Sequence, residues 1–306
     1  MTGSALMRGA ARDLYTGDDP ASPEVIAEDR LEVLMSPRRV IERIEGARRS
    51  AELATLVGAG PPGPMRKAVL QAMPDEVADA TLLHRLLDDT ASAAFVSTHG
   101  WAAWTSDWRE RHRAAGLADR IDRDVTGVCM AFRPGSAAVR PDGRSNVERQ
   151  SHAIAPLPLR ADDPYAWHRF EDADGPNQRR SRRIDLWAED GLLRLDAEFQ
   201  DSAALPGVRE LRNIFHEYRV QATVEPDSLI LRSIAVTPAV LPYGECIGAA
   251  LSAQRMVGSS IEGFGRGVAA ALPGTLGCTH LNSLLAALRD VVALSRHLEH
   301  RAALNA

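Results

Sequence analysis

Apolar and polar residues alternate with a period of two through much of the C-terminal half of the chain. This is the pattern of β-strands that bury one face and expose the other. Four such segments follow one another along the sequence: 183–188, 193–200, 216–224 and 229–236. The first two are separated by Glu189-Asp190-Gly191, which is a hairpin-turn signal. Consecutive strands joined by short turns predict an antiparallel meander sheet.

Helical spacing replaces the alternation after the fourth strand. It predicts helices over 245–256 and 261–270, and a last long helix whose apolar stripe runs from Leu281 to Leu298. An order of strands followed by helices is typical of the α+β class. We therefore predict that residues 165–306 form an α+β domain with an antiparallel meander sheet covered by C-terminal helices.

The N-terminal half shows a different pattern. Residues 1–22 mix small, basic and acidic residues without the apolar core of a signal peptide, which predicts a disordered tail. Residues 23–164 predict a mostly helical region that ends in a connection rich in proline, glycine and charge at 133–164. The elements expected within it are three helices and one strand, at 37–56, at 65–72, from 74 onward and at 125–132.

Composition narrows the class of protein. The 306 residues carry a net charge of −5, whereas proteins that bind nucleic acid usually have a basic excess. No apolar run approaches the ~18 residues that a membrane span needs. Three cysteines in a chain of this length do not form a disulfide framework, and the usage of alanine and arginine over lysine is typical of GC-rich bacteria. We expect a cytoplasmic bacterial protein with a small-molecule partner and neither membrane nor nucleic acid; a homodimer stays open.

Two of the cysteines and two histidines are candidates for chemistry. Cys278 and His280 stand at the start of the last predicted helix, and Cys246 opens an earlier one. The positive end of a helix dipole favours a thiolate. His216 begins a predicted strand on its apolar side, in phase with Tyr218. All four candidates can therefore reach the boundary between sheet and helices.

These residue types suit several kinds of site. Sulfur and imidazole ligands favour zinc or iron over magnesium or calcium. Without a metal, the same residues suit a cysteine nucleophile with a histidine base, and a buried cysteine is also a common inert core residue. Glu217 or Asp201 would act as the general base or as a hydrogen-bonding partner of a ligand.

Three further residues are candidates for substrate binding. Arg183 belongs to the basic run at 179–183, which can bind an anion or simply form a solvated strand entry. His168 lies in an aromatic and basic cluster at 167–170 that would line a pocket or pack. Tyr243 precedes Cys246 closely enough to share its surroundings.

A set of short motifs resembles a known family. In chain order these are Arg182-Arg183-Ile184, Asp190-Gly191-Leu192, Asp201, His216-Glu217, Pro242-Tyr243 with Cys246, and GTLGCTHL at 274–281. Together they resemble the bacterial domain-of-unknown-function family 2889, from Trp167 to near Leu298. The resemblance identifies a family, but it does not imply a particular reaction.

The order of elements is also similar to that of iron–sulfur scaffold proteins of the IscU-like fold. That resemblance implies a metal held by His216 at a strand start, by Cys246 at one helix start, and by Cys278 with His280 at another. The chain departs from the pattern, because a histidine replaces the first cysteine and the last pair is Cys-x-His. With these differences the resemblance still implies a metal site, but it argues less for assembly of an iron–sulfur cluster.

The leading hypothesis is a metal-binding enzyme of small-molecule metabolism, a zinc- or iron-dependent hydrolase, lyase or isomerase. The alternative is a metal or iron–sulfur carrier without turnover. A third reading treats the cysteines as structural and the domain as an interaction module.

Overall fold

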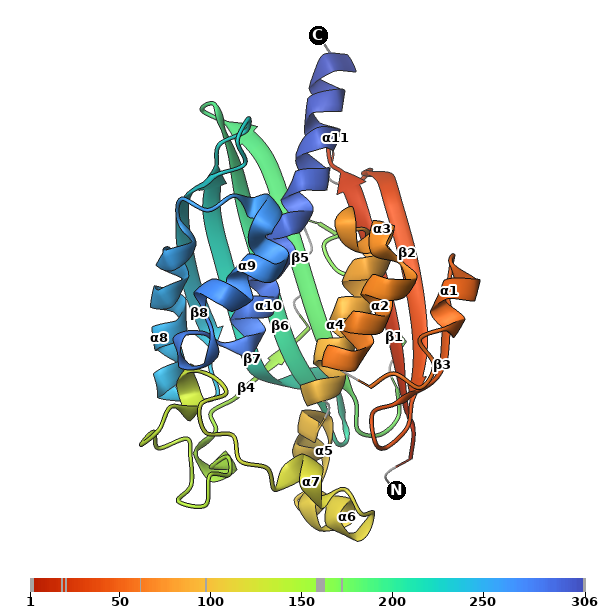
Figure 1. Cartoon of the computed structure of the whole chain (residues 1–306), viewed down its shortest axis with the longest axis vertical. Helices are drawn as coiled ribbons and strands as arrows, with labels where there is room; N and C mark the ends of the chain where they lie inside the picture. Colours follow the sequence, from red (N-terminus) through yellow and green to blue (C-terminus); the bar gives the residue numbers. More distant parts are fainter. Residues whose placement is uncertain are drawn as a thin grey trace. The chain divides into compact units, whose positions relative to one another are not determined.

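The chain folds into two compact units in a computed structural model, which describes residues 3–17, 19, 21–60, 62–96, 98–157, 163–171 and 173–304. The first unit combines Met1–Ile121 with Pro158–Asn177, and the second combines Asp122–Leu157 with Gln178–Ala306. Each unit has its own antiparallel sheet and its own helices (Figure 1). Among the described residues, none of the helices combines the length and apolar character that crossing a bilayer requires.

The first unit is a three-stranded sheet covered by helices. Its strands, in spatial order, are β1 (Ala5–Tyr15), β2 (Glu24–Met35) and β3 (Ile41–Gly46). Alternate residues of β2 are buried and pack with α2 and α4 in one apolar core. The helices are α1 (Ser50–Ala54), α2 (Gly63–Ala72), α3 (Pro74–Ala78), α4 (Leu82–Val96), α5 (Thr98–Trp104), α6 (Trp108–Ala114) and α7 (Ala118–Ile121).

This unit contains more strand than the sequence predicts. The tail predicted to be disordered at 1–22 contains β1, which pairs with β2 along its whole length. The helix predicted over 37–56 is wrong in its first part, which forms β3, and only α1 is helical. Both errors have one cause: these strands are stabilised by pairing with β2, a long-range interaction that local periodicity does not report.

The predicted strand at 125–132 is also wrong. Gly127 adopts a positive φ of 81°, and its N–H donates to the Phe132 carbonyl at 2.7 Å, so the segment closes on itself as a loop. Only a short 3₁₀ helix, η1 (Met130–Phe132), forms there. Asp122–Leu157 belongs to the second unit, so the predicted boundary at residue 165 does not separate the two units.

The second unit confirms the predicted meander. Strands β5 (Gln178–Glu189), β6 (Leu192–Leu205), β7 (Val208–Val224) and β8 (Leu231–Val240) pair antiparallel in chain order. The β5–β6 turn has Asp190 and Gly191 at φ 53° and 72°, the two positive values that a tight type I′ hairpin requires. A short strand, β4 (Ala153–Pro156), pairs with the first part of β7.

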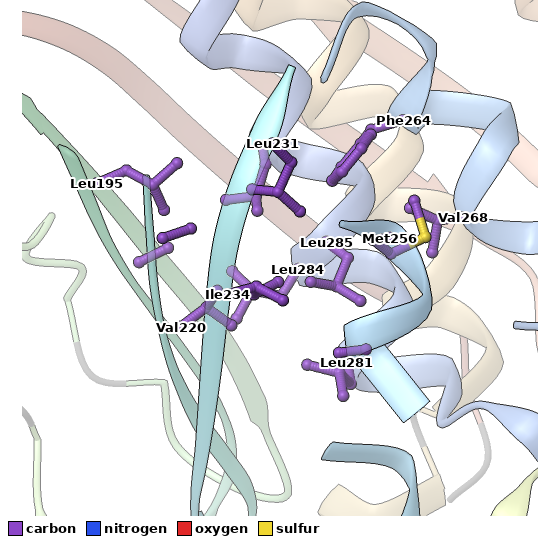
Figure 2. Packing of buried hydrophobic residues seen from close by; sticks show 14 of the residues in the cluster. Leu195, Val220, Leu231, Ile234, Met256, Phe264, Val268, Leu281, Leu284 and Leu285 are labelled. Carbon is purple, nitrogen blue, oxygen red and sulfur yellow. The ribbon is translucent and has the colours of Figure 1, made fainter. Parts of the chain in front are cut away.

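The C-terminal helices cover one face of this sheet, which makes the unit α+β as predicted. Inward residues such as Leu195 and Val220 meet Leu281 and Leu284 of α10 in a single core (Figure 2). The elements that follow the sheet are η3 (Gly244–Cys246), α8 (Ile247–Ser252), η4 (Ala253–Met256), η5 (Ile261–Gly263), α9 (Phe264–Ala271), η6 (Gly274–Leu276), α10 (Thr279–Ala287), η7 (Leu288–Asp290) and α11 (Val291–Leu304).

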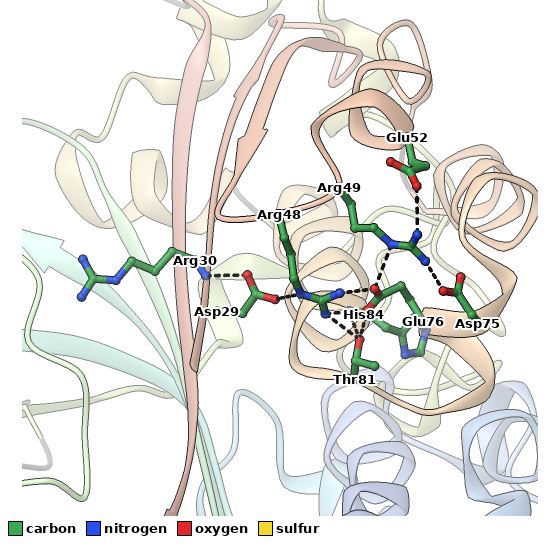
Figure 3. A network of polar contacts seen from close by, with 9 residues as sticks. All are labelled: Asp29, Arg30, Arg48, Arg49, Glu52, Asp75, Glu76, Thr81 and His84. Atoms are coloured by element: carbon green, nitrogen blue, oxygen red, sulfur yellow. Dashed lines mark hydrogen bonds and ion pairs between the residues drawn. The ribbon is translucent and has the colours of Figure 1, made fainter. Parts of the chain in front are cut away.

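A network of charged side chains stabilises the first unit (Figure 3). Arg48 donates to the buried carboxylates of Asp29, at 2.8 Å, and of Glu76. Arg49 and Thr81 donate to Glu76 as well. Burial alone would raise the pKa of Glu76, but these hydrogen bonds outweigh it and lower the pKa from 4.5 to about 2.

We expect Leu285→Ala to destabilise the second unit by about 2–5 kcal/mol, because it removes buried methyl groups and leaves a cavity. Leu285 is 0% exposed, whereas Leu251 on α8 is 73% exposed, so Leu251→Ala serves as a control with little effect. Urea unfolding followed by far-UV circular dichroism measures both. Equal losses would contradict the assigned core.

We expect Glu76→Gln to destabilise the first unit by about 3 kcal/mol at neutral pH, because two arginines lose a buried counter-charge. The lowered pKa of Glu76 means that its carboxylate stabilises the fold above pH 4.5 and that this contribution is lost as the pH falls towards 2. The Glu76→Gln variant should therefore lack the part of acid unfolding that protonation of Glu76 causes in the wild type. Tryptophan fluorescence follows it, since Trp101, Trp104, Trp108 and Trp167 lie in this unit.

The control is Asp75→Asn. Asp75 also pairs with Arg49, but its side chain is 59% exposed, so the expected loss is below about 1 kcal/mol. A control that loses as much stability as Glu76→Gln would show that burial of the carboxylate is not the source of the effect.

Candidate metal centre

The sheet of the second unit places three polar residues in one row across its helix-covered face. Arg180 on β5 is the register partner of Asp201 on β6, and Asp201 is the register partner of His216 on β7. The next row on this face holds Phe199 and Tyr218, and the apolar core continues from there. One end of a mostly apolar face is therefore polar.

The start of α10 lies over this polar row. Cys278 is the N-cap residue of α10 and His280 is in its first turn. The segment before it is fixed by the Met130 N–H, which donates to the Gly277 carbonyl at 2.8 Å. A Cβ at position 277 would lie 2.6 Å from the carbonyl oxygen of Leu272, so only glycine fits there. The glycine of the GCTHL motif thus sets the entry of the chain into the site.

His216, Cys278 and His280 form a compact group of metal-ligand type. Their ligand atoms all lie within 4.8 Å of one another, and the residues are 6%, 3% and 7% exposed. The Cys278 Sγ is 3.9 Å from the His280 Nδ1. The two imidazole rings are stacked, with centroids 3.5 Å apart and planes inclined by 15°.

A buried ion pair stands behind His280. The Arg180 guanidinium binds Asp201 with two hydrogen bonds, from Nε to Oδ1 at 2.9 Å and from a terminal nitrogen to Oδ2 at 2.7 Å. Asp201 Oδ2 also lies 3.4 Å from the His280 Nε2. Contacts thus run from Cys278 through His280 and Asp201 to Arg180. In His280, Nε2 therefore faces the carboxylate of Asp201, and Nδ1 faces the sulfur of Cys278.

Burial controls the protonation of the thiols. It raises the pKa of Cys278, and a partly opposing effect comes from the Tyr218 hydroxyl. Burial likewise raises the pKa of Cys246 to about 12 and raises that of the Tyr218 phenol. The thiolates expected from the helix N-termini are therefore not favoured in this environment, because desolvation outweighs the dipole.

Cys246 is not a member of the metal-ligand group. It packs with Ala131, Ala138 and Tyr243 in a separate small cluster. The hydroxyl of Tyr243 faces Ser145 at 3.0 Å and donates to the Asn146 carbonyl at 3.3 Å. The structure thus brings together three of the four predicted ligands, and Tyr243 lies with the fourth.

The structure does not bring Glu217 to the group. Glu217 follows His216 along β7, so its side chain lies on the opposite face of the sheet, where Gln200 is its register partner. Burial raises the pKa of its carboxyl. Asp201, the other predicted acid, does reach His280.

The other predicted substrate residues lie elsewhere. Arg183 alternates with Arg182 along β5 and binds Asp185, with Nε 2.9 Å from Oδ1. His168 belongs to the first unit, where burial and the charges of Arg12 and Arg30 lower its pKa to about 4. Substrate binding by these two residues stays a prediction.

Residue type alone does not identify two residues of the site, Arg180 and Tyr218. Arg180 is one of several arginines in a basic run, and only strand register distinguishes it as the partner of Asp201. Tyr218 reads as a core residue, although its spacing of two from His216 already places both on one face.

The residues of this site lie within a region that matches a known family. Residues 178–294 match the model of the family described as "Protein of unknown function (DUF2889)". The match confirms the resemblance predicted from the motifs. The DUF2889 region includes every member of the His216, Cys278 and His280 group together with Arg180 and Asp201. No curated protein and no solved structure matches the chain, and the IscU-like similarity is not shown.

We expect Arg180→Leu to destabilise the DUF2889 region by about 3–5 kcal/mol, because it removes the counter-charge of a carboxylate that is 0% exposed. Arg219→Leu is the control, since the Arg219 pair with Asp196 is at the surface and should contribute about 0–1 kcal/mol. Urea unfolding measures both. Similar losses in the two variants would contradict the role given to the buried pair.

Proposed function

We propose that the second unit binds one zinc or iron ion through Cys278, His280 and His216, and that the loaded site acts on a small-molecule substrate. The observation that carries the proposal is the buried group of one sulfur and two imidazoles whose ligand atoms lie within 4.8 Å of one another. Sulfur and nitrogen donors of this kind suit zinc or iron.

A metal site uses more of the grouped residues than a cysteine nucleophile does. A nucleophile with its base and orienting acid would use Cys278, His280 and Asp201, and would leave the stacked ring of His216 without a part. Burial also raises the pKa of the Cys278 thiol, which works against a free thiolate. A bound cation favours loss of the thiol proton.

Binding of the ion requires a rotation of one ring. An imidazole nitrogen donates its lone pair in the plane of its ring, so two parallel rings 3.5 Å apart cannot both direct lone pairs at one ion. Asp201 Oδ2 lies 3.4 Å from Nε2 of His280, so His216 is the ring that we expect to turn. Its Cys278 and His280 partners already face each other through Sγ and Nδ1.

Three protein ligands leave a fourth position of a tetrahedral ion open. A zinc or iron ion in such a site would polarise a substrate carbonyl or activate water. Asp201 would hold the proton on Nε2 of His280, the role of a carboxylate that supports a histidine ligand. Hydrolase, lyase and isomerase chemistry all fit this description.

The burial of all three ligands favours an enzyme over the alternative carrier, because a carrier has to expose its cargo. The small-molecule substrate, the cytoplasmic location and the homodimer remain predictions from the sequence.

Metal analysis of the purified protein tests the proposal. We expect about one zinc or iron ion per chain in the wild type and its loss in Cys278→Ala. Cys246→Ala and Cys129→Ala are matched controls: they make the same substitution at the other two cysteines, both outside the ligand group, and should keep the ion. Elemental analysis by plasma mass spectrometry gives the ratio.

Wild-type protein that binds neither metal after refolding with each would overturn the proposal. So would loss of the ion from Cys246→Ala to the same extent as from Cys278→Ala. Circular dichroism on all three variants separates loss of a ligand from loss of the fold.

A further inference from the structure

A further buried polar group beside the metal centre is the hydroxyl of Tyr218. The residue is 1% exposed, and its hydroxyl has no hydrogen-bond partner by distance and angle among the described residues. Leaving a buried donor unsatisfied is unfavourable, so native proteins rarely do so without a reason. The position is therefore unusual for a residue whose only task is to fill the core.

One sulfur, that of Cys278, lies in the same buried cluster as Tyr218. Tyr218 lies two residues beyond His216 on β7, hence on the same face, and packs in one cluster with Cys278. Its hydroxyl interacts with the Cys278 thiol. The Cys278 thiol is therefore the candidate partner of this hydroxyl.

A thiol and a thiolate are different partners for such a donor. A neutral thiol is a weak acceptor of hydrogen bonds. A thiolate accepts a shorter, charge-assisted bond of about twice the strength. The Tyr218 hydroxyl therefore gains a full partner only when the Cys278 sulfur carries negative charge.

We propose that Tyr218 is a positioning residue of the metal centre, whose hydroxyl donates a hydrogen bond to the Cys278 sulfur when that sulfur is bound to the ion as a thiolate. The inference rests on the proposed function. It adds to that function a residue that fixes the direction of the sulfur and strengthens binding of the ion. Partners of this kind change metal affinity about 10–100-fold when they are removed.

Tyr243 provides a matched control in the same unit. It is also buried, but its hydroxyl has partners, Ser145 at 3.0 Å and the Asn146 carbonyl at 3.3 Å. Tyr→Phe at either position removes one oxygen and keeps the ring. The two variants therefore differ in what the lost hydroxyl contacts.

Titration with Co²⁺ tests the inference, because a cobalt–thiolate bond has a charge-transfer band in the near ultraviolet. We expect Tyr218→Phe to bind Co²⁺ about tenfold more weakly, with a shifted band, and to unfold without metal at a urea concentration no lower than the wild type does. We expect Tyr243→Phe to keep both the affinity and the band, and to unfold at a lower urea concentration.

The outcomes separate the inference from the function beneath it. A wild type without a thiolate band or Co²⁺ affinity would overturn the metal site itself. A wild type that binds Co²⁺, with an unchanged affinity and band in Tyr218→Phe, would overturn only the role of Tyr218. A Tyr218→Phe protein that fails to fold, or unfolds as early as Tyr243→Phe, would show that the hydroxyl is a structural donor, and the inference would be wrong.

Discussion

The second unit is organised around a carboxylate that water does not reach. Asp201 is 0% exposed, and an ion taken out of water is strongly unfavourable unless it is paired and hydrogen-bonded. Arg180 and His280 provide those partners from a neighbouring strand and from α10. Because both partners have to reach the same carboxylate, the register of β5 on β6 and the depth at which α10 begins are fixed together. The position of Cys278, two residues before His280, follows from that constraint.

The same helix meets two different requirements along its length. Leu281, Leu284 and Leu285 bury the body of α10 in the apolar core, which resists sliding or rotation of the helix (Figure 2). Its first turn presents a sulfur and an imidazole to the polar end of the sheet. Dense packing thus supplies the rigidity that a site of a few ångströms needs. A looser core would not hold the sulfur and the two imidazoles within 4.8 Å.

The sequence predicts well whatever depends on neighbours in the chain. Alternation is enough to identify β6 and β7 and to place His216 on the inner face, and the GCTHL motif marks the start of α10. It fails where long-range contacts decide: β1 forms through pairing with β2, and Cys246 packs in its own small cluster although it too stands at a helix start. Thiolates do not follow from helix dipoles here because desolvation, a property of the folded core, is the larger effect.

Buried charge alone does not mark a functional site, and the two units show the difference. In the first unit Glu76 and Asp29 are bound by Arg48, and Glu76 also by Arg49 and Thr81, so the carboxylates are satisfied by a hydroxyl and by guanidinium groups that never lose their charge (Figure 3). Such a network can only stabilise. In the second unit the chain of contacts from Arg180 through Asp201 continues to an imidazole and a thiol, both of which can give up a proton to bind an ion. The capacity for chemistry therefore lies in the imidazole and the thiol, and the buried charge alone does not provide it.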